Sequence, residues 1–79
     1  MITPDQCRAA RAILGWSVQD LASAANLGTA TIKRLEAGQV MQAATVTAVA
    51  TAVVDAGLIL LSAGEASPNG GEGVRRASN

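Results

Sequence analysis

The amino-acid sequence predicts an all-α domain of four helices, followed by a short β-like tail. Its 79 residues leave room for one small domain. Alanine, the strongest helix former, is the most frequent residue type, whereas Phe and Tyr are absent and Trp16 is the only aromatic residue. Hydrophobic residues make up 49% of the chain and charged residues 15%, a composition that favours a folded core over disorder. An all-β barrel is therefore not expected.

The first helix is expected to run from Pro4 to about Leu14. Thr3 supplies an N-cap hydroxyl, Pro4 fits the first helical position, and Gln6 completes a capping box with Thr3. Gly15 then provides a stop. The side chains spaced to face the core are Cys7, Ala10, Ile13 and Leu14.

A second start signal follows at once and predicts a helix over residues 18–25. Ser17 and Asp20 form an acidic variant of the capping box ahead of an apolar stretch. Asn26 tolerates the left-handed conformation that a sharp turn after this helix requires. Trp16, just before the helix, is expected to pack into the core at the corner with the first helix.

Two further helices are expected, each ending at a glycine. One lies between Gly28 and Gly38, over residues 29–37, and the other covers residues 43–56 and ends at Gly57. The apolar stripe of the last helix has the expected spacing and consists of Val46, Val49, Ala50 and Val53.

The composition changes after residue 58, so we divide the chain into a domain at 1–58 and a tail at 59–79. The apolar run at 58–61 is compatible with a strand, and residues 73–76 are a candidate antiparallel partner. The intervening residues are rich in Gly, Ser, Pro and Asn, as in a loop. Because an isolated two-stranded hairpin is marginal in water, the strands are expected either to pair with a second chain or to leave the tail largely disordered.

The composition argues against most enzyme and metal sites. The chain has no His and a single cysteine, Cys7, which excludes an internal disulfide, a cysteine-based zinc site and Ser–His or Cys–His catalysis. Cys7 is expected to be a small buried hydrophobe. The acidic residues form no close cluster: Asp5, Asp20, Glu36, Asp55, Glu65 and Glu72. We therefore expect neither an enzyme nor a cofactor.

We expect a cytoplasmic protein without a membrane segment. The N-terminus lacks the basic and then apolar pattern of a signal peptide. The apolar region at 40–64 is interrupted by polar residues and by Gly57. The formal net charge is zero, so charge alone does not indicate a nucleic-acid partner.

The two short helices at 18–25 and 29–37 form the part of the chain that indicates a function. The positions that would bury the corner between them are small or apolar: Leu21, Ala22, Leu27, Ile32 and Leu35. At about 100° per residue, Ala30, Lys33 and Arg34 point away from the buried side of the second of these helices. This outward surface is small and basic, as a helix that enters the major groove of DNA should be.

At these residues the sequence resembles the lambda-repressor-like, Xre-type helix-turn-helix proteins of bacteria. The resemblance lies in RAARAILGWSVQDLASAANLGTATIKRLEAG and continues through TVTAVATAVVDAGL, covering about residues 3–58. The tail SPNGGEGVRRAS is also similar to the ends of such small regulators. Three positions depart from the family pattern. Val18 replaces a phosphate-contacting glutamine, Asn26 replaces a turn glycine, and Gly28 replaces an N-cap serine.

The resemblance implies binding to double-stranded operator DNA through a recognition helix at about 29–37. The implied base-reading residues are Thr29, Ala30, Lys33 and Arg34. The candidates for phosphate contact are Ser17, Gln19, Gly28 and Thr31. The implied function is transcriptional regulation on the bacterial nucleoid, as a repressor or as an activator that contacts RNA polymerase or a regulatory protein.

A homodimer is expected because the chain has more apolar residues than one small core needs. The surplus residues, assigned to a dimer interface, are Val54, Leu58, Ile59, Leu60 and Leu61. A two-fold dimer also suits a palindromic operator. Two alternatives stay open: an antitoxin that uses the same fold, and a protein-interaction module that has lost DNA binding. Val18 and the zero net charge favour the second.

Overall fold

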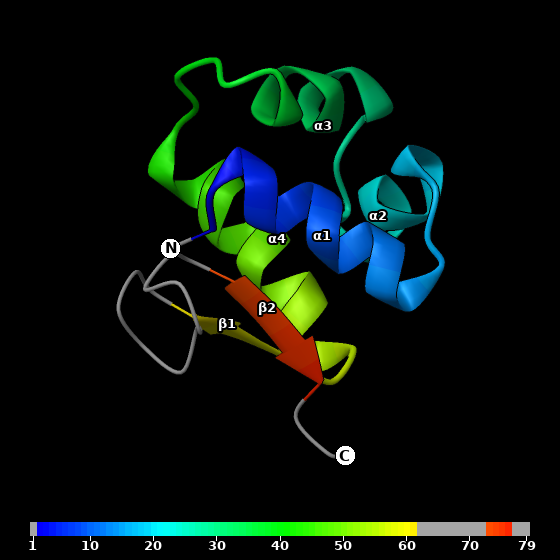
Figure 1. Cartoon of the computed structure of the whole chain (residues 1–79). Coiled ribbons are helices and arrows are strands. Elements are labelled where there is room, and N and C mark those ends of the chain that lie inside the picture. Colours follow the sequence, from blue (N-terminus) through cyan, green and yellow to red (C-terminus); the bar gives the residue numbers. More distant parts are fainter. Residues whose placement is uncertain (1, 62–72, 77–79) are drawn as a thin grey trace.

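The computed structural model describes residues 2–61 and 73–76, which form four helices and a two-stranded antiparallel sheet (Figure 1). The elements are α1 (Pro4–Leu14), α2 (Val18–Ala25), α3 (Thr29–Glu36), α4 (Ala43–Asp55), β1 (Leu58–Leu61) and β2 (Gly73–Arg76). The predicted mostly helical fold is confirmed. The third and fourth helices each end one residue earlier than expected, with Ala37 and Ala56 as their C-caps.

The two predicted capping boxes are present. The Thr3 hydroxyl accepts a hydrogen bond from the Gln6 amide N–H at 3.2 Å, and the Gln6 side-chain oxygen accepts one from the Thr3 N–H at 3.0 Å. Ser17 and Asp20 make the same reciprocal pair at the start of α2, at 3.0 and 2.9 Å. Asn26 ends α2 in the left-handed conformation, with φ at 58°. These bonds satisfy N–H groups that have no partner inside the helix.

The core lies where the apolar stripes of the four helices meet. Its largest fully buried side chains are Leu21, Ile32, Leu58, Val49, Val53 and Cys7. On α1, Cys7 and Ala10 are buried as expected, whereas Ile13 and Leu14 are only partly buried at the edge of the core. Trp16 also packs against the core while remaining partly exposed.

The two strands pair with each other, and β2 packs along α1 while β1 packs on α4 (Figure 1). Arg76 lies opposite Leu58, and Gly73 lies opposite Leu61. The expected antiparallel pairing of residues 58–61 with residues 73–76 is therefore confirmed within one chain, whereas pairing of these strands with a second chain stays a prediction. The residues between the strands, 62–72, lie outside the described part.

Hydrogen bonds to α1 stabilise the hairpin, which would be marginal by itself. The Gln6 side-chain amide donates to the Leu61 carbonyl at 2.8 Å and to the Gly73 carbonyl at 3.0 Å. At the other end of the sheet, the Arg76 guanidinium donates to the Ile13 carbonyl at 2.8 Å. The hairpin is therefore an integral layer of the domain.

The burial of β1 also corrects the expected surplus of apolar residues. Leu58 is 1% exposed and belongs to the core of its own chain, and Leu60 packs against that core. Alternation along the strand leaves Ile59 and Leu61 on the opposite face. Only part of the predicted dimer interface is therefore free to meet another molecule. Among the described residues, no helix is long and apolar enough to cross a membrane.

Candidate functional site

The candidate site is the corner formed by α2, a three-residue turn and α3. The turn comprises Asn26, Leu27 and Gly28, and the Leu27 N–H donates to the Ala22 carbonyl at 2.8 Å. Ala22 is buried, and its small side chain lets the two helices approach closely. Leu27 packs partly against the core and holds the turn onto it. These contacts fix the angle between α2 and α3.

The outward side of α3 carries all four residues that the resemblance assigned to base contact. Thr29, Ala30, Lys33 and Arg34 are exposed. Ile32 and Leu35, on the other side of the helix, are buried in the core. Neither Lys33 nor Arg34 forms an ion pair with a described residue. The side chains on this surface of α3 are therefore available to a partner molecule.

The candidates for phosphate contact lie around the start of α2 and the start of α3. Ser17, Gln19 and Gly28 are exposed, whereas Thr31 is partly buried. The Ser17 hydroxyl already accepts the Asp20 N–H and keeps its own proton to donate. Among the described residues, no side chain caps the N-terminus of α3. Backbone N–H groups at the start of this helix are therefore not occupied by a cap.

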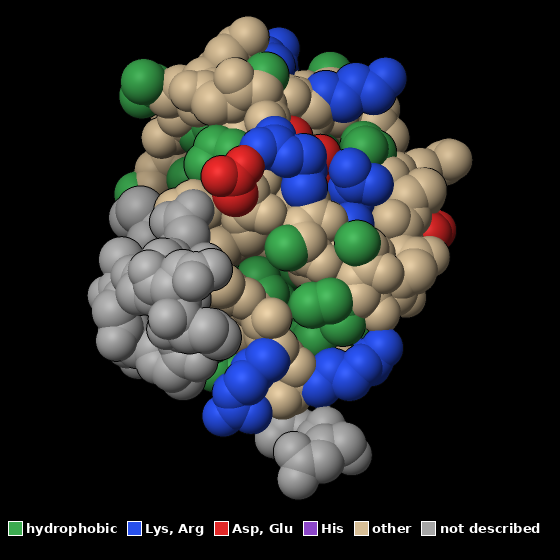
Figure 2. Space-filling view, in the orientation of Figure 1, with side chains coloured by type: hydrophobic (Ala, Val, Ile, Leu, Met, Phe, Trp, Pro, Cys, Tyr) green, Lys and Arg blue, Asp and Glu red, His purple; other side chains and the backbone are tan. Residues whose placement is uncertain are grey.

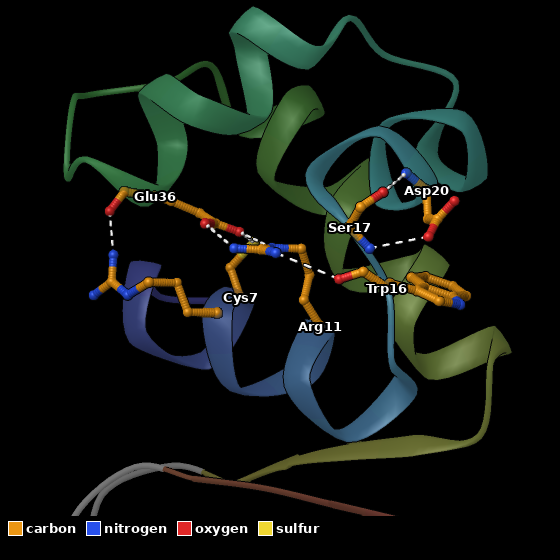
Figure 3. A network of polar contacts seen from close by, with 7 residues as sticks. Cys7, Arg11, Trp16, Ser17, Asp20 and Glu36 are labelled. Carbon is orange, nitrogen blue, oxygen red and sulfur yellow. Dashed lines mark hydrogen bonds and ion pairs between the residues drawn. The ribbon is translucent and has the colours of Figure 1, made fainter.

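An ion-paired network joins the end of α3 to α1 (Figure 3). Arg11 donates through Nε and Nη2 to the two carboxylate oxygens of Glu36, at 2.7 and 2.8 Å. The side chains of Arg11 and Glu36 are only 22% and 10% exposed. The Cys7 thiol donates to Glu36 Oε2 at 3.2 Å, and Arg8 donates to the Glu36 backbone carbonyl. Glu36 thus gathers three side chains of α1 at the end of α3.

The same network reaches the turn that precedes α2. The Arg11 Nη1 group lies 3.4 Å from the Trp16 carbonyl, at the corner between α1 and α2. Arg8 also pairs with Asp5, one turn earlier on the exposed side of α1. One partly buried guanidinium therefore connects α1, the α2 corner and α3, which sets their relative orientation.

The network changes the protonation of its members. Hydrogen bonds from Arg11 hold the pKa of Glu36 below its ordinary value, and the Glu36 carboxylate raises the pKa of Arg11. Burial, followed by the hydrogen bond to Glu36, raises the pKa of Cys7 to about 12. Since the thiolate is the reactive form of cysteine, Cys7 is an unreactive thiol at neutral pH.

Sequence reasoning missed the pairing of Arg11 with Glu36. The two residues are 25 positions apart, and no local pattern relates them. In the sequence, Glu36 is only one of six acidic residues that form no close cluster. The available signal was that Arg11 follows the buried Ala10 and so lies beside the apolar stripe of α1, but this does not identify its partner.

Basic side chains gather over α3, α1 and β2 on the face shown in Figure 2. All six Lys and Arg residues lie in the described part of the chain, whereas Glu65 and Glu72, two of the six acidic residues, do not. The described part therefore carries six basic and four acidic side chains, an excess of two positive charges. The zero net charge of the whole chain conceals this excess.

The described residues contain no pocket and no cluster of three or more potential metal ligands. No protein-family model matches the sequence, and a search of curated proteins found none that is similar to it.

Proposed function

We propose that this protein is a sequence-specific DNA-binding transcriptional regulator, in which α2, the turn and α3 act as a helix-turn-helix. The observation that supports this most is the division of α3 into two sides. Its buried side is held by Ile32, Leu35 and the Glu36 network, and its outward side presents small and basic residues without described partners. A rigidly held helix with such a surface suits the major groove.

The outward side chains suit particular base edges. Arg34 can donate two parallel hydrogen bonds to the O6 and N7 atoms of guanine, while the methyl groups of Ala30 and Thr29 match the methyl group of thymine. Lys33 reaches either a base edge or a phosphate. The proposed half-site therefore contains guanine and thymine in the major groove opposite α3.

Residues around the two helix starts are proposed to position the protein on the DNA backbone. The Ser17 hydroxyl, the Gln19 amide, the Gly28 backbone N–H and the Thr31 hydroxyl are donors suited to phosphate oxygens. Val18 packs partly against the core, so the exposed Gln19 beside it is the polar side chain available at the start of α2. Such contacts add affinity but little sequence preference.

Regulation would follow from occupancy of a promoter by a homodimer. A two-fold dimer places two copies of α3 on successive major grooves of a palindromic operator. Bound across a promoter, it would block RNA polymerase, and bound beside one, it would contact polymerase or a regulatory protein. This proposal places the protein in the cytoplasm, on the nucleoid.

Fluorescence anisotropy tests the proposal directly. The purified protein is titrated onto DNA from upstream of its own gene and onto a scrambled duplex, at two salt concentrations. We expect tighter binding to the upstream DNA, and binding that weakens steeply as salt rises. Equal and weak binding to both duplexes, followed by a genome-wide selection that enriches no sequence, would contradict it and favour a protein-interaction module.

A further inference from the structure

Helix α1 is hydrogen-bonded to the β1–β2 hairpin near both of its ends. Close to the start of α1, the Gln6 side-chain amide donates to the Leu61 and Gly73 carbonyls. Near the other end of α1, the Ile13 carbonyl accepts a hydrogen bond from the Arg76 guanidinium. The hairpin is therefore attached to α1 at two points that lie about two helical turns apart.

Between these two points, α1 holds the end of α3. Glu36, the last residue of α3, accepts hydrogen bonds from three side chains of α1. Cys7 and Arg11 donate to its carboxylate, and Arg8 donates to its backbone carbonyl. Cys7 is fully buried and directly follows Gln6 in the chain. The residues that hold α3 and those that hold the hairpin thus lie within the same turns of one helix.

The arrangement in space makes α1 the connection between the hairpin and α3. Figure 1 shows α1 between α3 and β2, and α1 contacts both. In Figure 3, Cys7 and Arg11 are directed from α1 towards Glu36, while the two strands pass on the other side of the helix. Because α1 is a single helix of 11 residues, a movement of this helix displaces its contacts on both sides.

We infer that the hairpin and the end of α3 are coupled through α1, so that release of the hairpin from α1 also frees the end of α3. In the released state, α1 lacks its hydrogen bonds to the strands and the apolar contacts of the hairpin with the core. The hydrogen bonds from α1 to Glu36 then no longer hold α3 in one position. The hairpin is thus a conformational switch for α3.

The hairpin is the part of the described fold that is suited to open. Each strand has four residues, and a two-stranded sheet is marginal by itself. Leu60 and Val74, which pack against the core, are only partly buried, and Arg76 is exposed. Segments with few buried contacts open at a lower free energy than the core of the same protein.

The consequence for DNA binding rests on the proposed function and adds a means of regulating it. A DNA-binding surface on α3 is competent only while the end of α3 is held, so the apparent Kd rises as the fraction with an attached hairpin falls. With about one molecule in ten still attached, the apparent Kd is about tenfold higher. By reciprocity, DNA that binds α3 favours the attached hairpin.

Native-state hydrogen exchange measured by NMR, without DNA and at low urea concentrations, tests the coupling. Val74→Ser weakens the packing of the hairpin on the core without changing its charge. We expect amide exchange to become about tenfold faster in both strands and also at the Glu36 and Ala37 N–H groups at the end of α3. Val74→Ile, which keeps this position apolar, should retain slow exchange at both places.

The matched control is Val46→Ala, a substitution at a buried residue of α4. It should lower the stability of the whole domain without accelerating exchange of the hairpin and the end of α3 at low urea concentrations. Faster exchange of the hairpin in Val74→Ser with an unchanged rate at the end of α3 would overturn the inference, because the hairpin would then open independently. Equal acceleration in α2 and α4 would also overturn it, since it would report global unfolding.

A second experiment adds duplex DNA from upstream of the gene. We expect bound DNA to slow exchange in the hairpin of the wild type, and Val74→Ser to bind about tenfold more weakly at an unchanged molar mass. Unchanged hairpin exchange in a protein that binds the duplex would contradict the coupling. A protein that binds no DNA would contradict the proposed function instead, and the exchange measurements without DNA would still decide whether the hairpin and α3 are coupled.

Discussion

At the scale of single residues, α3 contains side chains of two kinds within one turn. Glu36 is bound to Arg11, Cys7 and Arg8, and these contacts fix where the helix ends. Arg34, two residues earlier, is exposed and has no described ion-pair partner. The first kind of residue should affect stability and the second should affect binding, so substitutions can separate the two roles.

The Glu36 carboxylate should make stability depend on pH. Its pKa is lowered mainly by hydrogen bonds from Arg11, so the unfolded chain binds the proton more readily than the folded one. Its contribution is fully present above the unfolded pKa of about 4.3 and is lost as the pH falls through the folded pKa. We expect the free energy of unfolding to decrease as the pH is lowered from about 5 towards 3, and to decrease less in Glu36→Gln. Urea denaturation followed by Trp16 fluorescence measures this.

The control for the pH experiment is Asp5→Asn. Asp5 pairs with Arg8 on the exposed side of α1, and an exposed pair contributes little to stability. Its removal should leave the pH dependence close to that of the wild type. A Glu36→Gln variant with the wild-type pH dependence would show that the Arg11 pair does not stabilise the folded state.

Substitutions on the outward side of α3 should separate base contact from backbone contact. Under the proposed function, Arg34→Ala should lose about 1–3 kcal/mol of binding free energy and relax the preference at one base pair. Lys33→Ala, one residue away, should weaken binding to all sequences about equally if it contacts a phosphate. Anisotropy with a set of single-base operator variants distinguishes these outcomes. Equal losses across every base variant for Arg34→Ala would argue against its contact with guanine.

At the scale of elements, the hairpin depends on α1. A two-stranded sheet is marginal by itself. Here the Gln6 amide holds the end at Leu61 and Gly73, and the bond from Arg76 to the Ile13 carbonyl holds the opposite end. Gln6 is 4% exposed and also completes the capping box of α1. One side chain therefore links the start of the first helix to both strands at the end of the chain.

Gln6→Glu should release the hairpin while leaving the capping box in place. A glutamate can still accept the Thr3 N–H but cannot donate to the Leu61 and Gly73 carbonyls. We expect a loss of about 1–3 kcal/mol in the free energy of unfolding and faster amide hydrogen exchange in β1 and β2. Ser17→Ala, which weakens the capping box of α2, is the control. Ser17→Ala should lower stability without selectively increasing exchange in the hairpin. The same exchange pattern in both variants would show that the Gln6 hydrogen bonds do not hold the hairpin on α1.

At the scale of the whole molecule, the core continues past the helices into β1. Leu58 is one of the largest fully buried side chains, alongside residues of α1, α2, α3 and α4. Beyond the expected boundary at residue 58, Leu60 and Val74 are partly buried and pack against this core. The described part of the tail contributes to the same hydrophobic cluster as the helices.

Substitutions at two adjacent residues of β1 should differ in their cost to stability, because Leu58 is buried in the core and Ile59 is on the opposite face. Leu58→Ala removes a buried side chain and should cost about 2–5 kcal/mol, a large part of the stability of a small domain. Ile59→Ala, on the outer face, should cost about 1 kcal/mol or less in the monomer. Thermal unfolding measured at concentrations too low for dimerisation makes the comparison. Similar costs for both substitutions would show that the two faces of β1 are equally buried.

The sequence by itself determined the helices, their starts and the exposed side of α3. Capping boxes at Thr3 and Ser17, the left-handed Asn26 and the apolar periodicity act within a few residues, so they can be recognised without knowing the fold. The two strands could also be located from the apolar run and its possible partner. Helical periodicity, which is also local, predicts that Ala30, Lys33 and Arg34 point away from the buried side of their helix, and all three are exposed.

Only the tertiary structure decided what these elements contact. The bonds from Gln6 to Leu61 and from Arg11 to Glu36 span 55 and 25 positions, and neither residue type nor spacing relates their ends. The same holds for the inward direction of Leu58, because the face of a strand that is buried depends on what packs against it. Contacts between residues distant in sequence form only when the whole chain is folded, and they determine which apolar residues enter the core and which remain on the surface.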